Sequence, residues 1–241
     1  MRRREISQDQ WERIEGLLPG RPGSHGGVAK DDRLFVNAIW PIAKTGLPWR
    51  NLPERFGHGD TVFQRFHRWC RKGVRQRLFE AVQDLDSEWL TLDSTVLRAH
   101  PHAAGMNTDE DDQALGRSRG GFGTKLHRGC ESLGNPVSLH LSPGQDAGCT
   151  HAPALPADRE PEVVIADKGY DTNAVIDAIE ERGANRVDQR ECDAILHRER
   201  NAVERCANRF EQFRRVATGY EKTARNFLGM VPFVAITMWL R

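Results

Sequence analysis

The sequence has no closely spaced pair of cysteines and no hydrophobic run long enough to cross a bilayer. Its five cysteines are scattered and none forms a CxxC pair, which speaks against a zinc site or a disulfide framework and fits a reducing cytoplasm. The most apolar segment, residues 227–240, contains Pro232 and is shorter than the roughly 20 residues that a membrane helix requires. The sequence therefore predicts a cytoplasmic protein that does not enter a membrane, with a buried helix near its C-terminus.

An excess of one charge and internal repetition are missing as well. The formal net charge is +1, so only local clusters of charge can indicate a nucleic-acid partner. Residues 1–4 are basic, but no apolar stretch follows them, so they do not resemble a signal peptide. At 241 residues the chain is long enough to bury a core and to form one large domain or two smaller ones.

Three segments near the N-terminus have apolar residues at helical spacing. Ser7 starts the first with Gln10 at the capping-box position, the second spans residues 34–42, and Asp60 is expected to cap the third. Residues 61–77 contain no acid but six basic residues, which are Arg65, Arg68, Arg71, Lys72, Arg75 and Arg77. This strip is either a solvated basic face or the phosphate-binding face of a helix-turn-helix-like domain.

Two aspartates occupy strand positions. Leu90 and Leu92 alternate with polar residues up to Asp93, which is typical of a strand with one buried face. Residues 163–166 form a continuous apolar run followed by Asp167. Such a run is typical of a strand that is covered on both faces, and α/β sheets bind ligands at the carboxyl ends of such strands. Taken singly, Asp93 is better explained as an exposed aspartate at a strand end.

A third acid, Glu204, lies in a helical pattern over residues 198–215. Apolar residues form one stripe of this helix, and Arg200 and Glu204 fall on the neighbouring stripe. A surface ion pair would explain Glu204 taken alone. Two strand aspartates and a helix glutamate together are an oxygen-ligand set of the kind that Mg²⁺ prefers.

The remaining pattern predicts further strands and helices. Residues 122–130 and 136–141 are expected to pair as a hairpin through Gly134 and its neighbour. A helix is expected from residue 172 to about 181, ended by Gly183. Residues 78–85 are expected as a linker. The segments 101–116 and 152–157 are expected to be a mobile loop and a short helix or loop.

Several short motifs, in their order and spacing, resemble those of DDE transposases of insertion sequences, in the IS4/IS5 grouping and within it the IS5 family. The motifs are residues 92–95, 116–121, 124–127, 143–145, 166–171, 213–218 and 220–222. The resemblance covers nearly the whole chain. It implies an α/β fold in which a ribonuclease-H-like mixed sheet flanked by helices (residues 86–241) follows an N-terminal all-α, helix-turn-helix-like DNA-binding domain (residues 1–85).

The resemblance implies a transposase that binds the ends of an insertion sequence, cleaves them and joins their 3′ hydroxyls to target DNA by two-metal phosphoryl transfer. Asp93, Asp167 and Glu204 would hold two Mg²⁺ ions, or Mn²⁺ in their place, with Arg200 among the catalytic residues. Thr95 and Asp171 would support this site. The residues expected to contact DNA are Arg65, Arg68, Arg71, Lys72, Lys125, Arg214 and Arg215; of these, Lys125, like Arg200, would hold phosphate oxygens at the site. The expected partners are double-stranded DNA and a second protomer in a synaptic complex at the nucleoid.

The sequence departs from the family's pattern near Glu204. His197 and Glu211 stand where the family has Tyr and Lys, residues 185–188 form a poor strand, and the segment 183–198 is shorter than usual. Three functions therefore stay open: an active transposase, a decayed remnant that only binds DNA, and a nuclease that uses the same acids without strand transfer. A zinc or iron site built from histidines is a rival for the metal, although no spacing repeats a known ligand pattern. Its candidates are His100, His102, His127, His140 and His151.

Overall fold

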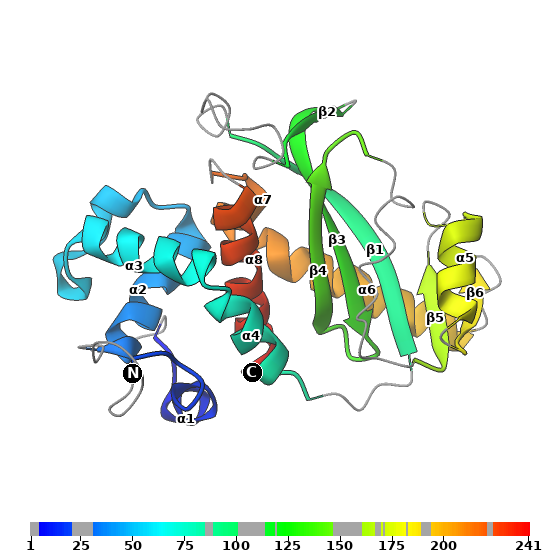
Figure 1. Cartoon of the computed structure of the whole chain (residues 1–241), viewed down its shortest axis with the longest axis horizontal. Helices are drawn as coiled ribbons and strands as arrows, with labels where there is room; N and C mark the ends of the chain where they lie inside the picture. Colours follow the sequence, from blue (N-terminus) through cyan, green and yellow to red (C-terminus); the bar gives the residue numbers. More distant parts are fainter. Residues whose placement is uncertain are drawn as a thin grey trace.

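A computed structural model shows a bundle of helices joined to a mixed sheet (Figure 1). The residues described are 5–20, 31–84, 89–100, 114–118, 120–146, 161–166, 170, 172–181, 183–188, 194–220 and 224–241; side chains are not described at 174, 178, 186–188 and 194–200. The coarse expectation of an α/β fold with a mixed sheet and flanking helices is confirmed. The expected boundary near residue 85 lies outside the described residues and stays a prediction.

The N-terminal part of the chain folds into short helices. They are α1 (Gln8–Glu15), α2 (Asp32–Thr45), α3 (Gly59–Arg71) and α4 (Val74–Ala81), with 3-10 turns at Trp49–Asn51 and Glu54–Phe56. The capping box of Ser7 and Gln10 is confirmed. The expected cap of α3 is wrong, because His58 is the N-cap and Asp60 lies in the first turn. The helix dipole still stabilises the carboxylate of Asp60 at that position. The first half of the expected linker, residues 78–81, belongs instead to helix α4, in which Leu78 and Phe79 are buried.

In the described part of the chain the sheet has six strands. They are β1 (Trp89–Arg98), β2 (Gly116–Ser118), β3 (Gly121–Glu131), β4 (Pro136–Pro143), β5 (Val163–Ala166) and β6 (Asn185–Asp188). The main order is β4-β3-β1-β5-β6, and β2 also pairs with β3. β3 runs antiparallel to β1, β2 and β4, whereas β1, β5 and β6 are parallel. The expected β3–β4 hairpin and the expected interior strand at 163–166 are both confirmed.

One expectation about the sheet is wrong. Residues 185–188 form a strand, and its backbone pairs with β5 from Val163↔Asn185 to Ala166↔Asp188. Helix α5 (Asn173–Glu180), with Thr172 as N-cap, and the turn at Gly183, where φ is +71°, return the chain to the sheet edge. Backbone hydrogen bonding to β5 thus forms a strand that the side-chain pattern of residues 185–188 does not predict. The supporting strand is therefore present in this chain.

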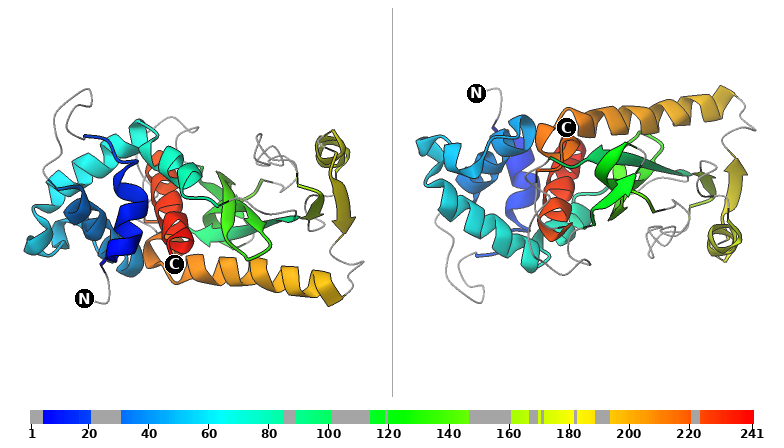
Figure 2. Two further views of the ribbon diagram at one scale, coloured as in Figure 1. Left: turned by 90° about the horizontal axis from the view of Figure 1, so that it is seen from below. Right: turned by 90° about the horizontal axis from the view of Figure 1, so that it is seen from above.

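Three C-terminal helices connect the two parts. They are α6 (Ala194–Glu211), α7 (Arg214–Ala217) and α8 (Ala224–Trp239). The single helix expected over 198–215 is interrupted before the buried Phe213, whose ring stacks edge-on against Trp40. Helix α6 runs along one face of the sheet, and α8 lies between the N-terminal helices and the sheet (Figure 2). The expected buried terminal helix is confirmed, Pro232 included.

The hydrophobic core runs through α8 without a break. Buried side chains of the N-terminal helices, the sheet and α8 form a single cluster. The end of α8 is held to α1, because Gln10 Nε2 donates to Leu240 O over 2.9 Å and Arg13 donates to Trp239 O over 2.9 Å. None of the described helices is long and apolar enough to cross a membrane.

Candidate active site

Asp93 on β1 lies directly opposite Arg128 on β3 in the sheet register. One guanidinium nitrogen, Nη2 of Arg128, contacts Asp93 Oδ2 and also donates to Thr95 Oγ1 over 2.7 Å. The Arg128 side chain is 1% exposed and the Asp93 side chain 28%. Asp93 is therefore a partly exposed carboxylate that is paired with a buried arginine.

Sequence reasoning missed Arg128. Burial lowers the pKa of the guanidinium, but the charge of Asp93, the nearby thiols of Cys130 and Cys206 and the hydrogen bond to Asp93 together outweigh it, so the net shift of the Arg128 pKa is upward. Nε of Arg128 is buried and has no hydrogen-bond partner within the described part of the chain. The available signal was a strand position between the apolar Leu126 and Cys130, where an arginine needs a carboxylate partner.

Helix α6 covers the face of the sheet that carries this pair. Cys206 on α6 and Cys130 on β3 are buried free thiols that share a hydrogen bond. That hydrogen bond and burial raise the pKa of Cys130, so its thiol stays protonated. Val203 is buried beneath the helix and Glu204 is exposed. The structure thus places Glu204 on a helix that packs against β1 and β3.

The structure describes the other two expected catalytic residues, Asp167 and Arg200, only in part. Asp167 and the side chain of Arg200 lie outside the described residues, as does Asp171. The last described pair of β1 and β5 is Leu92 with Ala166, and in the sequence each of these two residues is followed by an aspartate, Asp93 or Asp167. Within the described residues no group of three His, Cys, Asp or Glu side chains could hold a metal ion. Carboxylate oxygens such as those of Asp93 and Glu204 nevertheless have the donor chemistry that suits Mg²⁺.

Lys125 is not brought to Asp93. It lies three residues from Arg128 on β3 and opposite Val96 on β1, so it points to the other face of the sheet. Its ammonium donates to the carbonyl of Asp146.

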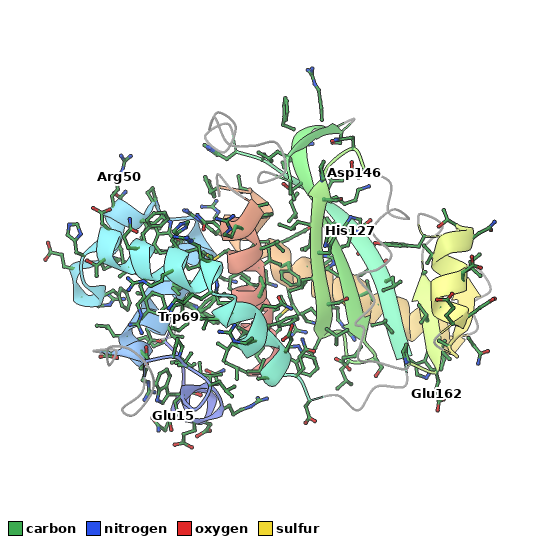
Figure 3. All side chains as sticks on the ribbon, in the orientation of Figure 1. Glu15, Arg50, Trp69, His127, Asp146 and Glu162 are labelled. Carbon is green, nitrogen blue, oxygen red and sulfur yellow. The ribbon has the colours of Figure 1, made fainter. Side chains whose placement is uncertain are left out.

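The histidines have other partners. His127, labelled in Figure 3, is buried in the sheet, with Nδ1 3.1 Å from Tyr170 Oη and Nε2 2.8 Å from Ser142 Oγ. The ring centroids of His127 and His140 are 6.0 Å apart. The ring of His100 lies 4.7 Å from that of Tyr220, and His102 and His151 lie outside the described residues. Both ring nitrogens of His127 are thus engaged with protein hydroxyls.

The basic residues expected to contact DNA divide into two groups. Arg65 pairs with Asp32 and lies 4.3 Å over the Phe35 ring, and so it holds α3 against α2. Arg215 is buried and donates to the carbonyl of Leu47 over 3.2 Å. The exposed members are Arg68, Arg71, Lys72 and Arg214. The first three of these line a hollow on α3 of about 480 Å³ together with Gln64 and His67.

A second basic hollow lies where β2, β3 and the end of β1 meet. It measures about 610 Å³, and its lining in the described part of the chain includes Arg98, Arg117 and Phe122 but no acidic residue. Phe122 is 56% exposed and Arg117 lies 5.9 Å from its ring centroid.

Comparison with known families agrees with this geometry. Residues 86–236 match the family described as "Transposase DDE domain", and residues 6–79 match the family described as "Putative transposase of IS4/5 family". The chain therefore belongs to the DDE transposases of insertion sequences, in the IS4/IS5 grouping.

Three relatives fit this assignment. The chain is 43% identical over 101 residues to "Uncharacterized protein y4sN" of Sinorhizobium fredii (42% of this chain, 81% of the relative). It is 30% identical over 128 residues to "Putative transposase for insertion sequence element IS6501" of Brucella ovis (49% and 98%). It is 33% identical over 107 residues to "Insertion element IS402 uncharacterized 16.2 kDa protein" of Burkholderia cepacia (39% and 73%). No solved structure matches the chain.

Proposed function

We propose that this chain is an IS5-type transposase that binds the ends of an insertion sequence, cleaves them and joins their 3′ hydroxyls to target DNA. The observation that carries the proposal is the position of Asp93 on the middle strand of the β4-β3-β1-β5-β6 sheet, beneath the helix that bears Glu204. Three antiparallel strands followed by two parallel ones are the arrangement of a ribonuclease-H-like domain, here residues 86–241. Residues 1–85 would be the DNA-binding domain.

Asp93, Asp167 and Glu204 would hold two Mg²⁺ ions. When bound, such a pair polarises a phosphate, activates water and stabilises the leaving oxygen. The protein's own contribution is positional: Arg128 and Thr95 fix the carboxylate of Asp93, and packing of Cys206 on Cys130 fixes the helix that carries Glu204. Arg200 would hold a phosphate oxygen.

Double-stranded DNA is the proposed partner, with two protomers joining two ends. Arg68, Arg71 and Lys72 form an exposed cluster of cations, and such clusters bind phosphates by releasing counterions. The hollow of Arg98 and Arg117 would extend this surface along the catalytic sheet.

Glu204→Gln is expected to abolish Mg²⁺-dependent cleavage of the element's ends while DNA binding persists, because a metal-binding carboxylate contributes several kcal/mol to the transition state. Cleavage of end-labelled DNA and gel-shift binding would be measured on the same preparations. Glu180→Gln, the same change at an exposed position of α5, is the matched control. Undiminished cleavage by Glu204→Gln would remove Glu204 from the site.

Reversal of charge at Arg68 and Arg71 is expected to weaken DNA binding and to flatten its salt dependence. Each lost phosphate contact lowers the slope of log K against log salt by about 1. Arg65→Gln removes a cation of the same helix that is engaged with Asp32, so it should reduce thermal stability and leave the slope unchanged. An unchanged slope in the Arg68/Arg71 variant would identify the cluster as a solvated face.

A further inference from the structure

The buried guanidinium of Arg128 shares its charge with one carboxylate. Asp93 is the only acidic side chain that pairs with Arg128 among the described residues. The other groups that face the guanidinium are Thr95 and the thiols of Cys130 and Cys206, and none of these carries the full negative charge that a buried cation needs. The pairing of Arg128 with Asp93 is therefore required by burial.

In a metal-bound protein, Asp93 would therefore interact with two cations, Arg128 and the metal ion. Its Oδ2 is held by Arg128, so Oδ1 is the oxygen left for a metal ion. A divalent ion at Asp93 would also lie close to a fixed positive charge, which cannot move away because the side chain is enclosed by β1, β3 and α6. Like charges at such separations repel strongly, and more so away from water.

We propose that Arg128 is a resident cation of the active site that positions Asp93 and weakens metal binding. The inference rests on the proposed function, since it concerns the same carboxylate. In the metal-free protein, Arg128 neutralises the charge of Asp93 and holds its carboxylate in a partly exposed position. With Oδ2 held by Arg128, Asp93 would offer mainly Oδ1 to a metal ion. Arg128 is thus a positioning residue that sets how much metal the enzyme needs.

Metal affinity can be measured without DNA and without activity. Mn²⁺ would be titrated calorimetrically into the whole protein and into variants at position 128. Arg128→Met removes the charge and keeps a long side chain, whereas Arg128→Lys keeps the charge. Removal of one nearby positive charge is expected to tighten Mn²⁺ binding on the order of tenfold. The Lys variant should bind Mn²⁺ as the wild type does.

The test does not depend on whether one particular variant folds. Asp93 is 28% exposed, so water can solvate its carboxylate once Arg128 is replaced. Should Arg128→Met fail to fold, Arg128→Gln serves in its place, since its amide can donate to Asp93 without a charge.

The possible outcomes separate this inference from the proposed function. Tighter Mn²⁺ binding by the Met or Gln variant, with wild-type affinity in the Lys variant, supports the resident cation. Equal or weaker binding in the uncharged variants overturns it and leaves the metal site intact. If no variant binds Mn²⁺, or if Glu204→Gln binds it as the wild type does, the proposed metal site fails as well.

Discussion

Asp93→Asn should lower the free energy of unfolding of the metal-free protein by roughly 3 kcal/mol, because it leaves a buried guanidinium without its carboxylate. This value is the low end for a broken buried pair, since Asp93 is partly exposed and Asn can still accept a hydrogen bond. The result would be unusual for a metal-site acid, whose removal commonly relieves repulsion between carboxylates. Urea denaturation followed by circular dichroism, in the presence of EDTA, measures it.

Two comparisons sharpen the experiment. Glu204→Gln changes an exposed acid and should alter stability by less than about 0.5 kcal/mol. In the double variant Asp93→Asn/Arg128→Met both charges are gone, so the cost should be well below that of Asp93→Asn alone. Equal stability of Asp93→Asn and Glu204→Gln would show that Arg128 does not depend on Asp93. The stability cost also makes Glu204→Gln the cleaner inactive variant.

Gly134→Ala should destabilise the protein by about 3 kcal/mol or more. Gly134 turns the β3–β4 hairpin at a φ of +80°, and a Cβ there would lie 2.5 Å from the carbonyl oxygen of Ala202 on α6. Backbone strain of about 1–2 kcal/mol then adds to a clash that only movement of the hairpin or of α6 can relieve. Because α6 carries Glu204, cleavage should fall further than the folded fraction does.

Gly183→Ala is the control for strain alone. Its φ is +71°, but a Cβ would meet no atom of the described residues within 4 Å, so the expected cost is about 1–2 kcal/mol. Denaturation of the two variants side by side gives the difference. Equal costs would show that the hairpin yields to an added methyl group and does not fix α6.

The elements that carry the site were predictable where a local pattern defines them. The alternation around Leu92 predicted the strand of Asp93, and the turn at Gly134 predicted the hairpin. Strand β6 was missed because it pairs along the sheet edge through its backbone, which leaves little trace in side chains. The interruption before Phe213 was missed because the apolar stripe continues across it.

Arg128 shows a different limit of sequence reasoning. A charged residue in a sequence is normally assigned to the surface, and only the register of β1 and β3 reveals Asp93 opposite it. Register depends on pairing between distant segments. The same reason separates Arg65 and Arg215, which pack internally, from the exposed Arg68 and Arg71. By contrast, the strand pattern alone already implied that Lys125 and Arg128 point to opposite faces.

Strand transfer tests the proposed function most directly. A pre-cleaved element end with a free 3′ hydroxyl would be incubated with plasmid DNA, Mg²⁺ and either the wild-type protein or Glu204→Gln. An active transposase should yield joined products with the wild type and none with the variant. The departures at His197 and Glu211 leave a DNA-binding remnant as the alternative. Binding of the end without joining would indicate that remnant, cleavage without joining would indicate a nuclease, and either result would contradict the proposed transposase.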